Sequence, residues 1–172
     1  MTDARAHRTC LTLIESGANI TLTGKKNNRN PQPVIRTYNI KRFNLLFNRG
    51  FLFYASFNII LFIYLLTRKK ISLLVSCDLD TLPANYLASV LRRCPLVYDS
   101  HEYFTEVPEL QNRKFVRNFW LRIEKFILPK LKYAYTVSES IAKEYTEKYK
   151  VEFKVIRNLP LKIKNTDVYP LP

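Results

Sequence analysis

The sequence predicts an α/β domain of Rossmann-like type, with a mostly parallel sheet and helices on both faces. Short apolar segments alternate with longer helical ones along the chain, which is the pattern of a covered parallel sheet. The composition, with 47% hydrophobic and 24% charged residues, is ordinary for a globular protein. The length of 172 residues suits one domain with a sizeable core.

The first half contains two helices and three strands by its apolar pattern. A helix is expected where Thr2 or Asp3 can cap the start and Gly17 suits the end. Alternation then predicts two short strands, and a long apolar stretch leads to a third. In order, these are a helix (3–16), strands (20–23 and 34–38), a helix (44–67) and a strand (71–75).

The second half repeats the alternation of helix and strand. Proline is tolerated at the first helical turn, as at Pro83, whereas Pro129 is expected to kink or end its helix, and Ser138 to cap the next. The expected elements are helices (82–93, 113–132 and 139–149) and strands (96–98, 133–137 and 153–156).

Four of these strands are followed directly by polar clusters. The carboxyl ends of parallel strands meet at one edge of a sheet, where ligands bind in this fold class. We therefore expect one functional edge, made of Asp78-Leu79-Asp80, Asp99-Ser100-His101-Glu102, Ser138-Glu139-Ser140 and Arg157-Asn158.

The charge is large and uneven. The net charge is +14, and no acidic residue occurs between Glu15 and Asp78. Such a block favours an anionic partner, which can be nucleic acid, anionic lipid or a phosphorylated ligand. The three scattered glycines disfavour a phosphate-binding glycine loop, and the three cysteines without CxxC spacing indicate free thiols in a reducing compartment.

Several segments together resemble a known enzyme family. These are TDARAHRTCLTLIESGANITL near the start, then SCDLDTLPANYLAS, LVYDSHEYFTE, YTVSESIAKEY and VIRNLP in that order. Over residues 2–160 the chain resembles the N-terminal half of a GT-B glycosyltransferase of the retaining family 4 type. In that family the N-terminal half binds the acceptor and the C-terminal half binds the nucleotide sugar.

The resemblance also implies a domain organisation. It covers residues 1–160 as one domain, with 161–172 as a hinge or linker tail, and the donor domain is expected to be absent from this chain. In the family a central first strand and a tight turn precede TDAR, so the sheet is expected to lack that strand. The chain is therefore expected to be inactive alone, and a non-catalytic remnant is an open alternative.

The resemblance places Asp3, Arg5, Asp80, His101 and Glu102 in an acceptor cleft, with Ser138 as a further contact. His101 is the candidate for acting on an acceptor hydroxyl, since imidazole exchanges protons near neutral pH. A purely structural role remains open for each: helix capping for Asp3, Asp80 and Ser138, and a hydrogen-bonded strand end for His101. Asn158 and Pro160 match the family's hinge segment.

No metal and no cofactor are expected. His7 lies far from His101 in the sequence, and carboxylates alone hold a cation only loosely. The resemblance also implies catalysis without a metal.

Two apolar segments suggest contact with a membrane. Residues 51–67 are at the short end of the spanning range and carry basic residues on both flanks, so a helix packed on the sheet fits better than a spanning one. Residues 113–132 combine an apolar stripe with a basic face, which suits either an amphipathic helix with a solvated face or docking on anionic lipid. We expect a cytoplasmic protein, peripheral on the inner membrane face, that binds a sugar or lipid-linked acceptor.

The rival interpretation of the charge is a basic nucleic-acid-binding module. The aromatic residues lie mostly in apolar runs rather than among exposed basic ones, which disfavours it.

Overall fold

The computed structural model describes residues 4–26 and 36–159. Its elements, in chain order, are α1 (Ala4–Glu15), β1 (Thr21–Lys25), β2 (Asn39–Phe43), α2 (Gly50–Thr67), β3 (Leu74–Cys77), α3 (Leu82–Arg92), β4 (Leu96–Ser100), α4 (Pro108–Gln111), α5 (Lys114–Ile127), β5 (Tyr133–Thr136), α6 (Glu139–Tyr149) and β6 (Phe153–Val155). Short 3-10 turns, Phe104–Glu106 and Leu128–Lys130, precede α4 and follow α5.

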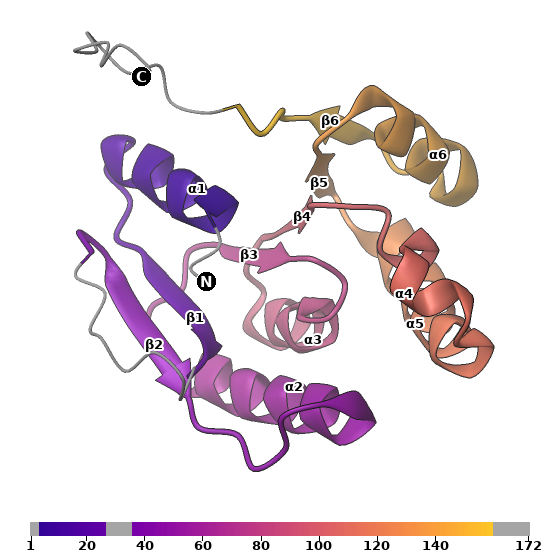
Figure 1. The fold of residues 1–172 in the computed structure, drawn as a ribbon. Helices are drawn as coiled ribbons and strands as arrows, with labels where there is room; N and C mark the ends of the chain where they lie inside the picture. The colour runs from indigo at the N-terminus through magenta and orange to yellow at the C-terminus, as the bar shows by residue number, and fades with distance from the viewer. Residues whose placement is uncertain (1–3, 27–35, 160–172) are drawn as a thin grey trace, which may run out of the picture.

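All strand pairings in the described residues are parallel, and they form two sheets. The pair β1–β2 stands apart from a four-stranded sheet with the order β3-β4-β5-β6. Helix α1 lies on one side of the strands, and α2 and α3 lie on the other (Figure 1). The predicted α/β class with helices on both faces is confirmed, and β1 and β3 are left without a strand between them in the described residues.

Three predicted starts in the first half are wrong, and one of them is that of β3, which begins at Leu74 rather than residue 71. Strand β2 spans Asn39–Phe43 rather than 34–38, and the hydroxyl of Tyr38, directly before the strand, lies 2.9 Å from Nδ1 of His7 in α1. Helix α2 begins at Gly50 rather than residue 44, because Gly50 has a left-handed φ of 73° that does not continue a helix upstream. The end of α5 before Pro129 is as predicted, since a proline ring excludes continuation of the helix.

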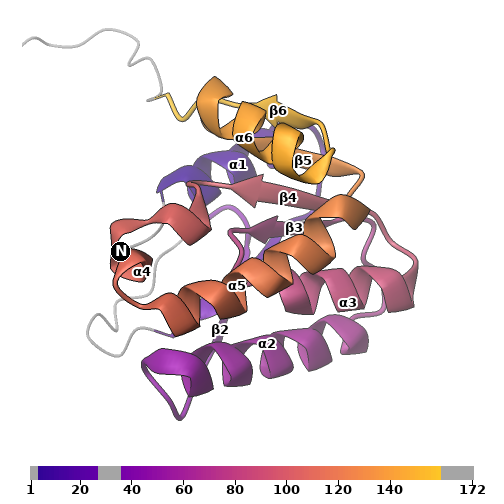
Figure 2. The same cartoon turned by 90° about the vertical axis from the view of Figure 1, so that its right-hand side faces the viewer.

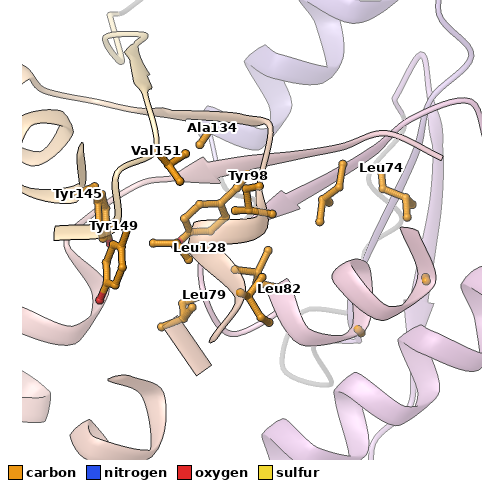
Figure 3. Packing of buried hydrophobic residues seen from close by; sticks show 14 of the residues in the cluster. Leu74, Leu79, Leu82, Tyr98, Leu128, Ala134, Tyr145, Tyr149 and Val151 are labelled. Carbon is orange, nitrogen blue, oxygen red and sulfur yellow. The ribbon is translucent and has the colours of Figure 1, made fainter. Parts of the chain in front are cut away.

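The core lies between the four-stranded sheet and the helices that cover it. Tyr98 of β4 is completely buried and packs beside Leu82 and Leu128, which are also inaccessible (Figure 3). The ring of Tyr98 meets Phe153 of β6 edge to face at 6.2 Å, and Phe153 stacks on Tyr145 of α6 at 4.7 Å. Residues of α3, β4, the 3-10 turn after α5, α6 and β6 therefore close this half of the domain.

Helix α2 is apolar on all sides but is attached to the domain along one face. Phe57, Leu61 and Leu65 recur every four residues and are buried. On the same helix, the Asn58 side chain accepts from the Ala84 amide at 3.1 Å and donates to the Asp80 carbonyl at 2.8 Å. By length and composition alone α2 is long and apolar enough to cross a membrane, which is weak evidence for a span.

Candidate functional site

Side chains from three neighbouring strands and from α1 meet at the carboxyl edge of the four-stranded sheet. Asp78 follows β3, Asp99 lies near the end of β4, and Tyr135 comes from β5, while Arg5 reaches the edge from the first turn of α1. The predicted convergence of strand ends is thus present for β3 and β4.

The centre of the site is a buried ion pair between Arg5 and Asp99. Nη2 of Arg5 donates to Asp99 Oδ1 at 2.5 Å, and Nε of Arg5 lies 3.4 Å from Asp99 Oδ2. Arg5 is 7% exposed and Asp99 is fully buried. The Tyr135 hydroxyl also donates to Asp99 Oδ2 at 2.8 Å, so both carboxylate oxygens have donors.

His101 stands between two carboxylates. Its Nε2 lies 3.3 Å from Asp99 Oδ2, and its Nδ1 lies 3.3 Å from Asp78 Oδ2. The His101 amide also donates to Asp78 Oδ1 at 2.8 Å. The ring is therefore held in one orientation, with 17% of the side chain open to solvent.

A left-handed backbone conformation aims the Asp78 carboxylate at His101. Asp78 has φ of 61°, which Asp tolerates better than most residues. Its amide donates to the Asp99 carbonyl at 2.9 Å, which ties the turn after β3 to the end of β4. Such a conformation persists only where its surroundings support it, and it is common in functional sites.

The three aspartates of this edge have different protonation chemistry. Burial raises the pKa of Asp78 to about 6, although the neighbouring His101 acts against the rise. Burial, with the charge of Asp78, raises the pKa of Asp80 to about 7. Burial acts on Asp99 in the same direction, but hydrogen bonds from His101, Arg5 and Tyr135 outweigh it and hold the Asp99 pKa below its ordinary value.

These environments make Asp99 a permanent carboxylate and leave Asp78 and Asp80 able to take up a proton near neutral pH. A carboxylate that orients an imidazole, beside further groups that titrate near pH 7, is an arrangement suited to moving protons at a hydroxyl.

The structure brings together Arg5 and His101 from the residues singled out in the sequence. Asp80 lies near them, and its charge is felt at the same group of side chains. Glu102 is exposed, although its charge also acts on Asp78. Asp3 and Pro160 lie outside the described residues.

Ser138 and Asn158 make contacts with residues other than the Arg5–Asp99 pair. The Ser138 hydroxyl accepts from the Ile141 amide at 3.4 Å and so caps α6, as expected. Asn158, after β6, accepts a hydrogen bond from Arg8 of α1. The N-cap position of α3 is occupied by Thr81 rather than Asp80, and Thr81 makes no side-chain capping hydrogen bond there.

Asp78 and Asp99 belong to the strand-end clusters expected at this edge, although they were not among the individual acceptor-site candidates, and Tyr135 was in neither set. The two aspartates follow from the strand-end rule, because Asp78 comes directly after β3 and Asp99 is the next-to-last residue of β4. Tyr135 gives no such signal, since a tyrosine within an apolar strand is most often part of the core.

One group of side chains in the described residues has the composition of a metal site. Ligand atoms of Cys77, Asp99 and His101 lie within 4.8 Å of one another. The Arg5 guanidinium beside Asp99 places a positive charge against any cation there, and Tyr135 already occupies Asp99 Oδ2. These donors fit a hydrogen-bonded acid–base network better than a cation site.

A family model described as Glycosyltransferase Family 4 matches residues 4–159, which is nearly the whole chain. The chain belongs to glycosyltransferase family 4. It forms the N-terminal domain of the GT-B fold, and the site described above lies on a glycosyltransferase domain. No curated protein sequence matches the chain.

Proposed function

We propose that this domain is the acceptor-binding half of a glycosyltransferase that moves a sugar from a nucleotide donor to a hydroxyl of a cell-envelope glycan or glycolipid. The observation that carries the proposal is the network of Arg5, Asp99, His101 and Asp78 at the carboxyl edge of the sheet. Family membership supplies the reaction class.

In this proposal His101 contacts the acceptor. The acceptor hydroxyl takes the place of Asp78 at Nδ1 of His101, and this nitrogen then accepts the hydrogen bond or the proton of the hydroxyl. Asp99, beside Nε2, stabilises the imidazolium that results. Arg5 acts on Asp99 and is a positioning residue, because it keeps that carboxylate ionised and in place.

The two histidines of the chain allow a matched test. In cells that make the protein, His101→Ala is expected to abolish the glycan or glycolipid that the full enzyme produces, as measured by mass spectrometry of cell-envelope extracts. His7→Ala is the control, because His7 pairs with Tyr38 and Arg36 away from this edge. Unchanged product in His101→Ala cells with normal amounts of protein would contradict the proposed role.

We also propose that the nucleotide sugar binds to a second domain, so that the purified 172-residue chain has no turnover of its own. The support is the family resemblance, in which the donor signature belongs to the C-terminal half. Incubation of the chain with UDP-sugars, GDP-mannose and a lipid extract tests this, and transfer of labelled sugar above the level of boiled protein would refute it.

A second part of the proposal is peripheral binding to an anionic membrane on the cytoplasmic side. The amino ends of α2 and α5 lie side by side (Figure 2), and Phe51 of α2 meets Phe119 of α5 edge to face at 5.5 Å. We call Phe51, Phe115 and Phe119 the aromatic patch; their exposed fractions are 64%, 88% and 37%.

Exposed cations flank the aromatic patch. Arg49 precedes α2 directly, and Arg113 and Lys114 stand at the start of α5. Aromatic rings at a lipid surface with cations beside them match an interfacial site, in which each cation contributes about 1 kcal/mol on anionic lipid. The domain would then encounter a lipid-linked acceptor at the same membrane surface to which it is bound.

Vesicle flotation tests this part. The chain is expected to float with vesicles containing phosphatidylglycerol and to be released by salt, whereas Phe115→Asp weakens flotation about tenfold. Leu91→Asp, at an exposed apolar position of α3 outside the aromatic patch, is the control. Flotation unaffected by Phe115→Asp, or tight salt-dependent binding to DNA without flotation, would refute membrane docking and favour the nucleic-acid alternative.

A further inference from the structure

Charge is divided between the two edges of the four-stranded sheet. The carboxyl edge carries the carboxylates of Asp78, Asp80 and Asp99, whereas the segments that lead into β3, β4 and β5 at the amino edge are basic and contain no acidic residue. Their cations are Arg68, Lys69 and Lys70 before β3, Arg92 and Arg93 before β4, and Lys130 and Lys132 before β5. The amino edge, opposite the Arg5–Asp99 site, therefore attracts anions.

A pocket of about 480 Å³ opens at this basic edge, at the amino ends of β4 and β5. Its walls come from the end of α3, from the segment that enters β4 and from the segment that joins α5 to β5. The carboxyl ends of α3 and α5 lie on the same side of the domain as the amino end of β4 (right of Figure 2). We call it the amino-edge pocket, and its lining includes Tyr86, Arg93, Cys94, Lys130, Lys132 and Tyr133.

Three cations of the amino-edge pocket have no carboxylate partner in the part of the chain that the structure describes. Arg93, Lys130 and Lys132 are exposed, and none of the ion pairs there includes them. Lys130 Nζ lies 3.1 Å from the ring centroid of Phe126 and 5.9 Å from that of Tyr86. These rings keep the ammonium beside the pocket through cation–π attraction.

A neighbouring arginine has a structural use that these three cations lack. Arg92 closes the end of α2, because its Nη1 donates to the Leu66 carbonyl at 2.9 Å. Within the described ranges, the side chains of Arg93, Lys130 and Lys132 make no such hydrogen bond to a backbone carbonyl. Their charges are therefore available to an anionic ligand.

The composition of the amino-edge pocket fits a phosphorylated molecule that also carries a ring. Arginine and lysine are the side chains that bind phosphate oxygens. Tyr86 and Tyr133 place aromatic faces and hydroxyl groups beside the cations, and Tyr133 is 56% exposed. A volume of about 480 Å³ is within the range of about 300–1,000 Å³ of small-molecule sites.

We propose that the amino-edge pocket binds a small soluble phosphate ester of a sugar or another ring. Arg93, Lys130 and Lys132 hold the phosphate group, while Tyr86 and Tyr133 contact the ring. The site is separate from the edge around His101, because the two lie at opposite ends of β4 and β5.

The position of the amino-edge pocket favours a soluble ligand over a lipid headgroup. The aromatic patch, proposed above to dock on the membrane, includes Phe115 at the amino end of α5, whereas Lys130 follows the carboxyl end of this helix. Helix α5 has 14 residues, which corresponds to about 21 Å at about 1.5 Å per residue. A domain that docks through the aromatic patch therefore holds the amino-edge pocket away from the lipid.

Isothermal titration calorimetry of the 172-residue chain tests the proposal. We expect saturable binding of glucose 1-phosphate or phenyl phosphate, and none of glucose or phenol, because the phosphate supplies the contacts to the three cations. Lys130→Gln with Lys132→Gln is expected to weaken binding about tenfold or more, since two charge-assisted contacts are lost. The matched control, Lys69→Gln with Lys70→Gln, removes the same charge from exposed positions of the same edge outside the pocket and should change little.

Thiol labelling then locates the bound ligand. Cys94 lines the amino-edge pocket, whereas Cys77 is the last residue of β3 at the opposite edge, and both are half-buried free thiols. A saturating phosphate ester is expected to slow the reaction of Cys94 with N-ethylmaleimide and to leave that of Cys77 unchanged, as measured by mass spectrometry of the labelled peptides.

Several results would overturn the proposal. These are binding of neither phosphate ester, equal weakening in the two double variants, and protection of Cys77 instead of Cys94. Loss of vesicle flotation in the Lys130→Gln, Lys132→Gln variant without binding of soluble esters would assign these cations to a lipid surface, and binding of DNA alone would assign them to nucleic acid. None of these readouts depends on glycosyl transfer, so failure here and failure of the proposed function are distinguishable.

Discussion

Strands β1 and β4 have the same length and the same parallel pairing, but their surroundings differ. In β4 four of the five residues are buried, and the strand pairs with β3 and β5. In β1 no residue is buried, and the strand pairs in the described residues with β2 alone. Backbone pairing of one kind can therefore carry very different amounts of burial, and we expect the two sheets to differ in local stability.

The largest expected effect comes from comparing one substitution in each sheet for its effect on the free energy of unfolding. Tyr98→Ala removes a fully buried ring and is expected to lower the free energy of unfolding by about 3–5 kcal/mol. Leu22→Ala, in half-buried β1, is expected to cost about 1 kcal/mol or less. Urea denaturation measures both, and similar losses would show that β1 is as well packed as β4.

The next effect tests the connection between α1 and the four-stranded sheet. Arg5→Met leaves Asp99 as a buried carboxylate without its cation, which is expected to cost about 3 kcal/mol. Arg8→Met, which removes an exposed contact to Asn158, is the control. The double variant Arg5→Met with Asp99→Asn should regain part of the loss, because the uncompensated charge is gone.

A smaller effect concerns pH at the functional edge. The pKa of Asp78 is raised to about 6 and that of Asp80 to about 7, so the folded state binds more protons than the unfolded state between pH 4 and 7. The stability that these groups contribute is complete below their unfolded pKa and is lost as pH rises through the folded values.

We therefore expect the free energy of unfolding in urea to fall between pH 5 and pH 8 in the unchanged chain. In Asp78→Asn we expect this fall to be smaller by about 1–2 kcal/mol. Asp99, with a lowered pKa, loses its contribution only at more acidic pH. Glu152→Gln, at an exposed ion pair, is the control. An identical pH dependence in Asp78→Asn would mean that Asp78 titrates normally.

The smallest effect lies at the far end of the four-stranded sheet. Ser138→Ala removes the cap of α6 and is expected to cost about 1 kcal/mol in thermal or urea unfolding. Ser140→Ala, at the neighbouring exposed hydroxyl, should have little effect. A loss of stability in Ser140→Ala equal to that in Ser138→Ala would place the capping interaction elsewhere.

The periodicity of the sequence predicted the type of nearly every main element, but boundaries set by tertiary contacts were out of reach. Tyr38, directly before β2, contacts His7, which is 31 residues away in the chain, and no local pattern predicts that contact. The buried face of α2 was also not predictable, because a helix that is apolar on all sides gives no signal of which face packs against the domain.

The site was predictable in part. The strand-end rule located His101 and its aspartates at one edge, and the family resemblance added Arg5. The ion pair of Arg5 with Asp99 joins residues 94 positions apart, and no local sequence pattern predicts it. The role of Tyr135 was not predictable either, because only the register of β5 on β4 places its hydroxyl at Asp99.

The central claim is that the edge around His101 binds the acceptor while the nucleotide sugar binds elsewhere. NMR of the two histidine rings in the 172-residue chain tests it most directly, with titration by a cell-envelope glycolipid extract and, separately, by UDP-sugars and GDP-mannose. The account predicts that the extract shifts the His101 signals but not those of His7, and that the nucleotide sugars shift neither. A shift of His101 by a nucleotide sugar, with no response to the extract, would contradict it.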